Sequence, residues 1–219
     1  MGEEPTSFLY PFIDSEERDE VALVTDLSRS AAAKMAESRQ LGTLTIERSM
    51  TELQRAGREM AERFRLGGRL FAFGNGGSAT DAAGMVDLFL CPPGGAPLPA
   101  LALVDDQAVL TALANDVGYE LVFSRQIIAH ARSGDIAVGF STSGGSVNVL
   151  NAFDEATKRG ILTLGFAGYG GGSMATSSSL DHRLVVGSDS VHRIQEAQSA
   201  LVLELWSIVQ RSLSDREGQ

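Results

Sequence analysis

Hydroxyl-bearing residues gather in the segment 141–146, which reads Ser-Thr-Ser-Gly-Gly-Ser. The apolar run 136–140 precedes this segment, and a helical pattern begins near Val147. The pattern therefore predicts a strand, a loop and a helix N-terminus in direct succession. Free N–H groups of a first helical turn, the helix dipole and several hydroxyls can together hold a dianion without a lysine or an arginine. The segment is therefore predicted to bind phosphate.

A second loop of similar character, Gly74-Asn75-Gly76-Gly77-Ser78, follows the apolar run 70–73. In open α/β sheets, ligands bind outside the carboxyl ends of parallel strands. Two such loops in one chain therefore indicate a phosphorylated small molecule held at that edge of a sheet.

Apolar runs and helical patterns alternate through most of the chain. Strands are predicted at 69–73, 99–104, 136–140, 161–166 and 183–187. Helices are predicted at 79–90, 107–114, 119–131, 147–159 and 192–213. This alternation is typical of repeated βαβ units and of a parallel sheet covered on both faces. The sequence thus predicts an α/β fold with a parallel five-stranded sheet.

Two leading helices are predicted before the first strand. Asp14 and Glu17 resemble a capping box that opens the first helix. The second starts near Thr43 and ends at the glycine pair 67–68. We expect an irregular N-terminus over 1–14 and one domain over 15–219, with a helical segment at 15–66 and an α/β core at 69–213.

The composition favours a one-domain globular protein and argues against a nucleic-acid-binding or membrane protein. The chain has 219 residues, of which 43% are hydrophobic, enough for a full core in one domain. Its net charge of −10 argues against direct binding to nucleic acid or to an anionic membrane surface. No apolar run reaches the ~18 residues of a membrane span. Cys91 is the single cysteine, so no internal disulfide is expected, and the chain is predicted to be cytoplasmic.

Four motifs in register resemble one family. They are the glycine loop 74–78, Asn115-Asp116, the serine loop 141–146 with Asn148-Val149-Leu150 behind it, and Arg193-Ile194-Gln195-Glu196. Together they resemble the sugar isomerase (SIS) domain, in its sedoheptulose-7-phosphate (phosphoheptose) isomerase branch. The resemblance implies a flavodoxin-like three-layer α-β-α sandwich. It also implies a homo-oligomer, a tetramer or a dimer, with sites built at subunit contacts.

The resemblance also implies a set of positions that bind phosphate and sugar. They are Asn75, Gly76, Gly77, Ser78, Asp105, Asp106, Ser141, Thr142, Ser143, Ser146 and Gln195. One departure is Gly145, where the family often has asparagine. The hydroxyls around it remain, so we expect phosphate binding to persist.

The positions that carry chemistry in this branch differ more. There, a His and a Glu four residues apart and a Gln and a His eight apart perform the isomerisation and bind zinc. In this chain the first pair falls on Gly84 and Leu88, and the second on Gln195 and Leu203. Only the glutamine is retained. We therefore expect no zinc site and no cofactor.

Other polar residues are candidates to replace the missing groups. Asp106, His192 and Glu196 are weak candidates for catalysis, and Asp106 is also the best candidate for a sugar hydroxyl. Asp81 is interpreted as a first-turn partner of a helix dipole. His130 and His182 are interpreted as structural or surface residues.

Three functions remain open at this stage. The first is a phosphosugar-binding protein with a binding or regulatory role, or with an altered reaction. The second is an active aldose–ketose isomerase that uses Asp106, His192 or Glu196. The third is a protein-interaction scaffold, similar to the non-catalytic tetramer that binds the bacterial replication initiator.

Overall fold

The computed structural model describes residues 20–215, so the proposed capping box at Asp14 and the irregular segment 1–14 lie outside the described residues. The chain divides into two compact units, residues 1–40 and 41–219. The described part of the first unit belongs to helix α1 (Glu20–Arg65), which continues into the second unit. All features of the candidate site belong to the second unit.

The described residues of the second unit form a five-stranded sheet in the order β2-β1-β3-β4-β5, and every neighbouring pair is parallel. Its strands are β1 (Leu70–Gly74), β2 (Ala100–Ala102), β3 (Ile136–Ser141), β4 (Leu162–Gly168) and β5 (His182–Val186). Every residue of β1, β3 and β4 is buried, as expected for strands covered on both faces. The strand order places the topological switch point between β1 and β3.

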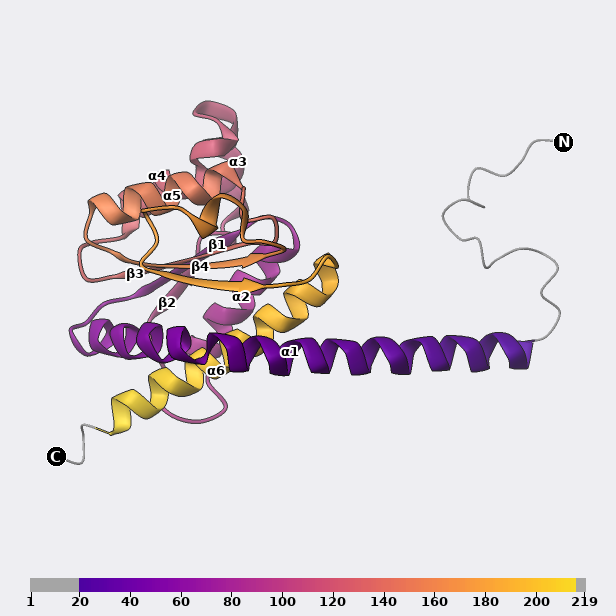
Figure 1. The fold of residues 1–219 in the computed structure, drawn as a ribbon. Helices are drawn as coiled ribbons and strands as arrows, with labels where there is room; N and C mark the ends of the chain where they lie inside the picture. Colours follow the sequence, from indigo (N-terminus) through magenta and orange to yellow (C-terminus); the bar gives the residue numbers. More distant parts are fainter. Residues whose placement is uncertain (1–19, 216–219) are drawn as a thin grey trace, which may run out of the picture. The chain divides into compact units, whose positions relative to one another are not determined.

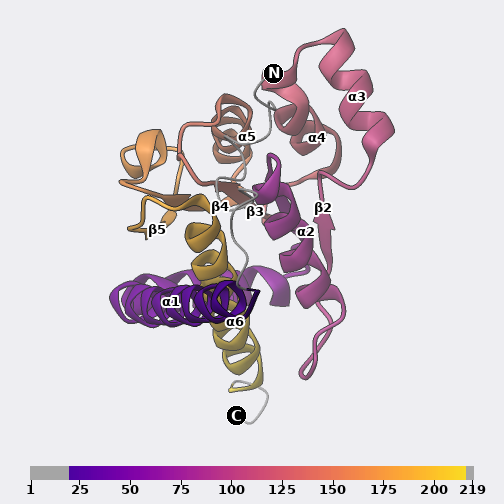
Figure 2. The ribbon, with the colours of Figure 1, turned by 90° about the vertical axis from the view of Figure 1, so that its right-hand side faces the viewer.

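Helices cover both faces of the sheet, which gives the α/β three-layer arrangement that the sequence predicted (Figure 1). The C-terminal part of α1, α2 (Gly77–Leu90) and α6 (Val191–Ser214) cover one face. On the other face lie α4 (Val122–His130) and α5 (Val147–Lys158), with α3 (Gln107–Asp116) beyond them. Figure 2 shows α2 and α6 on the side of the sheet opposite to α4 and α5.

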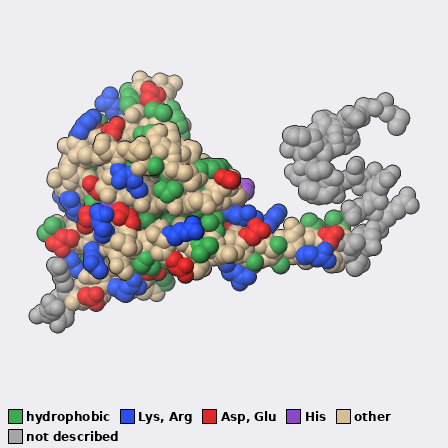
Figure 3. Space-filling view, viewed as in Figure 1, with side chains coloured by type: hydrophobic (Ala, Val, Ile, Leu, Met, Phe, Trp, Pro, Cys, Tyr) green, Lys and Arg blue, Asp and Glu red, His purple; other side chains and the backbone are tan. Residues whose placement is uncertain are grey.

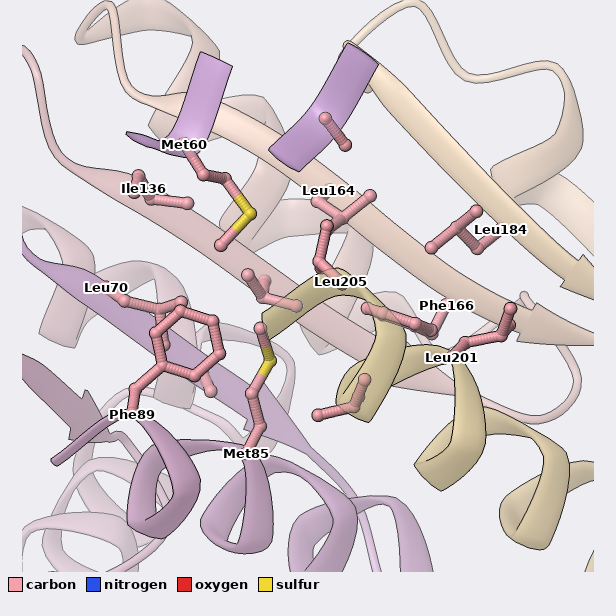
Figure 4. Packing of buried hydrophobic residues seen from close by; sticks show 14 of the residues in the cluster. Met60, Leu70, Met85, Phe89, Ile136, Leu164, Phe166, Leu184, Leu201 and Leu205 are labelled. Atoms are coloured by element: carbon pink, nitrogen blue, oxygen red, sulfur yellow. The ribbon is translucent and has the colours of Figure 1, made fainter. Parts of the chain in front are cut away.

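Apolar side chains from the helices and the sheet pack together on the face covered by α1, α2 and α6. Met60 of α1, Met85 of α2 and Leu201 of α6 lie in one buried apolar cluster with Leu164 and Phe166 of β4 (Figure 4). The Phe140 and Phe166 rings stack with centroids 4.6 Å apart. This core fixes α2 and α6 next to each other, and both helices start at the carboxyl edge of the sheet.

The prediction of two separate leading helices is wrong, because α1 is a single helix of 46 residues. The segment between the two predicted helices contains no proline, and Gly42 is its one helix-disfavouring residue. One glycine costs about 1 kcal/mol relative to alanine, which is too little to end a helix of this length.

No helix within residues 20–215 is long and apolar enough to cross a membrane. On the face that Figure 3 displays, Lys and Arg side chains are interspersed with Asp and Glu side chains. The acidic excess of the sequence is therefore not gathered into a block on that face.

Candidate functional site

The two predicted loops meet at the switch point between β1 and β3. The side-chain amides of Asn75 and Asn148 form a reciprocal pair: each Nδ2 donates to the other's Oδ1, at 2.8 and 2.9 Å. The Tyr119 hydroxyl also donates to Asn75 Oδ1, at 2.9 Å. Asn75 follows β1 and Asn148 lies in the first turn of α5, so this pair joins the glycine loop to the serine loop.

Three serine hydroxyls lie together in the serine loop. Ser141 Oγ is 2.9 Å from Ser146 Oγ and 3.4 Å from Ser143 Oγ. Ser143 Oγ accepts a hydrogen bond from the Gly145 N–H at 3.2 Å. Ser146 is the N-cap of α5, and within the described chain its side chain makes no capping hydrogen bond. The hydroxyls thus lie beside a helix N-terminus that no capping side chain occupies, which is the arrangement a phosphate needs.

Close backbone contacts fix the shape of this loop. Gly144 has φ +65°, and a Cβ there would lie 1.9 Å from the Gly171 carbonyl oxygen. The Gly144 carbonyl accepts a hydrogen bond from the Met174 N–H at 3.0 Å. The backbone carbonyl of Thr142 accepts a hydrogen bond from the Gly168 N–H at 2.9 Å. The loop after β4 therefore supports the serine loop from one side and requires glycine at 144.

The glycine loop opens α2 against the start of α6. Gly76 is the N-cap of α2 with φ 56°, a conformation that favours glycine. A Cβ at Gly77 would lie 2.0 Å from Gln195 Nε2, so the glutamine side chain occupies the space that this glycine leaves. Ser78 is buried in the first turn. The structure thus brings Gln195, which the resemblance implies as a binding residue, to the glycine loop.

A pocket of about 320 Å³ lies between the N-terminal turns of α2 and α6. It is lined by Gly77, Thr80, Asp81, His192, Gln195, Glu196 and Ser199. Two of the three weak catalytic candidates, His192 and Glu196, therefore line the same pocket as Gln195. Gln195 Nε2 donates a hydrogen bond of 3.5 Å to Asp81 Oδ2.

Asp81 is the described residue whose pKa is shifted most clearly by its surroundings. Burial raises the pKa of the Asp81 carboxyl to about 6, and the hydrogen bond from Gln195 opposes this change. A carboxyl that titrates near neutral pH can both accept and return a proton. The interpretation of Asp81 as a first-turn partner of the helix dipole is wrong, because α2 starts at Gly77 and its first turn contains no acidic residue.

A second pocket, of about 260 Å³, continues along α2 and α6 from the first. It shares Thr80, Asp81 and Ser199 with the first pocket and is otherwise lined by Gly84, Met85, Leu88 and Val202. Gly84 and Leu88 are two of the positions where the resemblance would require His and Glu. Leu203, at the third such position, is 53% exposed and lines neither of these pockets. No group of three or more His, Cys, Asp and Glu residues that could hold a metal is present within residues 20–215.

Asp105 and Asp106 follow β2 at the carboxyl edge of the sheet. Both are exposed, and Asp106 is the N-cap of α3, where its Oδ1 accepts from the Val109 N–H at 3.0 Å. Asp106 thus has a capping role and does not line the pocket between α2 and α6. The structure separates it from His192 and Glu196.

The raised pKa of Asp81 and the contacts that Asn148 and Tyr119 make with Asn75 were not predicted from the sequence. Burial raises the pKa of Asp81, and its hydrogen-bond partner Gln195 on α6 lies 114 positions away in the sequence. Tyr119 reaches Asn75 from the 3-10 turn that precedes α4, and no local pattern marks that contact. Asn148 belongs to the motif behind the serine loop, but its pairing with Asn75 was not predicted.

Comparison with known proteins identifies the family. Residues 35–168 match the SIS domain. The phosphoheptose isomerase of Roseiflexus sp. (strain RS-1) is 41% identical over 173 residues, which span 77% of this chain and 86% of that protein. The phosphoheptose isomerase of Desulfovibrio desulfuricans is 52% identical over 135 residues, which span 59% of this chain and 62% of that protein. The solved phosphoheptose isomerase of Neisseria gonorrhoeae has a TM-score of 0.78 and 33% identity, covering 84% of this chain and 99% of that one.

Proposed function

Because the chain belongs to the SIS domain family, we propose that it binds a phosphorylated sugar at the carboxyl edge of its sheet. The phosphate is held by the serine loop 141–146 and the N-terminus of α5. The observation that carries this proposal is the cluster of Ser141, Ser143 and Ser146 hydroxyls beside that helix N-terminus. The sugar extends past Asn75 and Gly77 into the pocket between α2 and α6.

The zinc-assisted chemistry of the phosphoheptose isomerase type does not fit this chain. Zinc in proteins takes Cys, His and carboxylate ligands. Gly84, Leu88 and Leu203 supply none of these donors, and Gln195 alone is no zinc site. We therefore propose a binding or regulatory member of the family, or one with an altered reaction, that works without that zinc.

Ligand binding is tested by calorimetry with sedoheptulose 7-phosphate and with hexose and pentose phosphates. Removing a hydroxyl that bonds a charged phosphate costs about 1.5–3 kcal/mol, so Ser143→Ala and Ser146→Ala should each weaken binding about 10- to 100-fold. Ser214→Ala is the matched control, because its hydroxyl bonds the Gln210 carbonyl near the end of α6. Binding that all three variants leave unchanged would contradict the phosphate site.

Metal content is measured separately by mass spectrometry on protein purified without chelators and loaded with excess zinc. The proposal expects less than one tightly held zinc per ten chains. Stoichiometric zinc that survives dialysis would refute the absence of a zinc site, without affecting the phosphate site.

A second function, an active aldose–ketose isomerase, is favoured by Asp81. Such a reaction moves a proton between adjacent carbons and needs a base near the reacting carbon and a donor to the carbonyl oxygen. The Asp81 carboxyl, with its pKa raised to about 6, is suited to the first task. The Gln195 amide and the His192 side chain line the same pocket and are suited to the second.

Deuterium exchange at the sugar in D₂O distinguishes the two functions. An isomerase should incorporate deuterium next to the carbonyl of sedoheptulose 7-phosphate, at a rate that rises as pH passes about 6 and that falls at least about 100-fold in Asp81→Asn. A protein that binds the sugar but exchanges no deuterium at high protein concentration is a binding member.

We also propose that the chain forms a homo-oligomer. Leu44 of α1, Leu90 of α2 and Leu203 of α6 expose large apolar side chains in the single chain, and apolar exposure of this kind supports an interface. Leu203→Glu should lower the mass measured by light scattering, whereas Leu101→Glu, on the edge strand β2, should not. An unchanged mass in Leu203→Glu would argue against an interface on α6.

A further inference from the structure

The second pocket between α2 and α6 has an apolar end and a polar mouth. Met85, Leu88 and Val202 form its apolar wall, together with the open backbone of Gly84. Thr80, Asp81 and Ser199 form the mouth, which it shares with the pocket assigned to the sugar. A ligand that fills both pockets therefore passes from a polar to an apolar environment.

Gly84 keeps this space open in the middle of a helix. A glycine in a helix interior costs about 1 kcal/mol relative to alanine, so it usually has a packing reason. Here a Cβ would meet no described atom within 4 Å, and the residue has no positive φ. Neither close packing nor backbone conformation requires glycine at this position. What glycine provides is empty volume at the wall of the pocket.

The mouth of the apolar pocket offers hydrogen-bond acceptors. The Thr80 hydroxyl donates to the Gly77 carbonyl at 2.6 Å, and the Ser199 hydroxyl donates to the Gln195 carbonyl at 3.1 Å. Since each hydroxyl has one proton, both oxygens face a ligand as acceptors. The ionised Asp81 carboxylate is also an acceptor. A ligand group at this point is therefore best matched when it donates a hydrogen.

The distance from the glycine loop to the apolar pocket suits a sugar that passes that loop. An α-helix rises 1.5 Å per residue, so Gly84 lies about 10 Å along α2 from Gly77 in the glycine loop. Gly77 and Asp81 both line the pocket assigned to the sugar, and Asp81 also lines the apolar pocket. A substituent on the sugar beside Asp81 therefore reaches the space over Gly84.

Resting on the phosphosugar site proposed above, we infer that the ligand is a phosphosugar that carries an acylamino group. The single amide N–H donates to one of the acceptors at the mouth, which are the Thr80 and Ser199 hydroxyls and the Asp81 carboxylate. The acyl chain lies against Met85, Leu88 and Val202. The pocket volume of about 260 Å³ leaves room for an acyl chain longer than acetyl. Leu88 and Gly84, where the related isomerases would place catalytic groups, thus determine specificity.

The test uses a homologous series of N-acyl-glucosamine 6-phosphates (acetyl, propanoyl and butanoyl), with glucose 6-phosphate and sedoheptulose 7-phosphate as parent ligands. Burial of one methylene gives about a fourfold gain in affinity. Calorimetry should therefore show affinity rising about fourfold with each added methylene.

Two variants locate the substituent. Gly84→Leu fills the pocket, so it should reduce the gain per methylene to less than twofold while keeping the affinity for glucose 6-phosphate within about threefold. Asp87→Leu is the control, because Asp87 is exposed on the same helix and lines neither pocket. This control should retain the full gain.

The outcomes of these binding measurements separate the acylamino inference from the proposed phosphosugar site. Equal affinity across the series, binding of the parent ligands alone, or a gain that persists in Gly84→Leu would each overturn the acylamino inference and leave the phosphosugar site standing. Absence of binding by every phosphosugar, including both parents, would instead overturn the proposed function itself.

Discussion

Asp81 links the chemistry of the candidate site to the stability of the chain. Burial raises its pKa from 3.8 to about 6, so folding favours the protonated carboxyl. The stabilisation linked to that proton is fully present below pH 3.8 and is lost as pH rises through about 6. At neutral pH the folded protein therefore holds a charged carboxylate that its surroundings solvate poorly.

Asp81→Asn tests this linkage, because the amide resembles the protonated carboxyl and keeps a partner for Gln195. The melting temperature of the variant minus that of the parent should increase between pH 4 and 7, by about 2–4 °C after allowance for partial exposure. Thermal unfolding across this range measures it. Asp87→Asn, on an exposed residue of the same helix, controls for the loss of one negative charge. A difference that is constant with pH would contradict the raised pKa.

Gly144 and Gly145 are neighbours, but the backbone requires glycine only at position 144. Gly144 has φ +65° and faces the Gly171 carbonyl, whereas a Cβ at Gly145 would meet only Ser143 Oγ, at 3.8 Å. Gly144→Ala should therefore destabilise the protein by about 2–4 kcal/mol, since both strain and a backbone clash oppose it. Gly145→Ala and Gly145→Asn should change stability by less than about 0.5 kcal/mol. Urea unfolding of the three variants checks the contrast, which equal losses at both positions would disprove.

The elements of the α/β core could be predicted because each has its own local pattern. All five strands lie within two residues of the predicted limits, and the serine and glycine loops follow β3 and β1 as expected. The one long helix α1 was predicted as two, with the second starting near Thr43. The first turn of α2 was also misplaced by two residues, which led to the wrong interpretation of Asp81.

The contacts between elements could not be read from the sequence in the same way. The amide pair of Asn75 and Asn148 joins two loops 73 positions apart, and the Gln195–Asp81 hydrogen bond joins helices 114 positions apart. Such contacts depend on strand order and on the packing of α2 against α6. Local periodicity predicts the helices, but it does not predict which faces of two helices share a pocket.

The contact between α1 and β5 is a further example, and it can be tested. His182 is 1% exposed; its Nδ1 lies 2.8 Å from Glu52 Oε1, and its Nε2 lies 3.3 Å from Glu59 Oε2. The interpretation of His182 as structural fits this burial. Glu52→Ala leaves the buried Nδ1 without its partner, so it should destabilise the protein by about 1–3 kcal/mol.

The control for this prediction is Arg55→Ala, which removes only the ion pair that Arg55 makes with Glu52 on the exposed side of α1. A surface pair of this kind contributes at most about 0.5–1 kcal/mol. Chemical unfolding should therefore separate the two variants. Equal losses would mean that the His182 contact contributes little.

At the scale of the whole molecule, the net charge and the site act in opposite directions on an anionic ligand. The chain carries a net charge of −10, and neither the glycine loop 74–78 nor the serine loop 141–146 contains a lysine or an arginine. Hydroxyls and backbone N–H groups attract phosphate only at short range, whereas the net charge repels it at long range. Binding therefore depends on contacts made after the ligand has crossed an unfavourable potential.

Salt should accordingly strengthen phosphosugar binding, the reverse of its effect on a site built from lysine and arginine. The Debye length falls to about 10 Å at 0.1 M salt, which screens the distant acidic groups more than the short contacts in the serine loop. Calorimetry between 20 and 200 mM sodium chloride should show affinity rising about two- to fivefold. Asp105→Lys, at an exposed residue of the same sheet edge, should bind more tightly at 20 mM and lose this rise, because it offsets the repulsion where the ligand enters. A steady fall of affinity with salt in the unmodified protein would instead reveal that cationic side chains hold the phosphate.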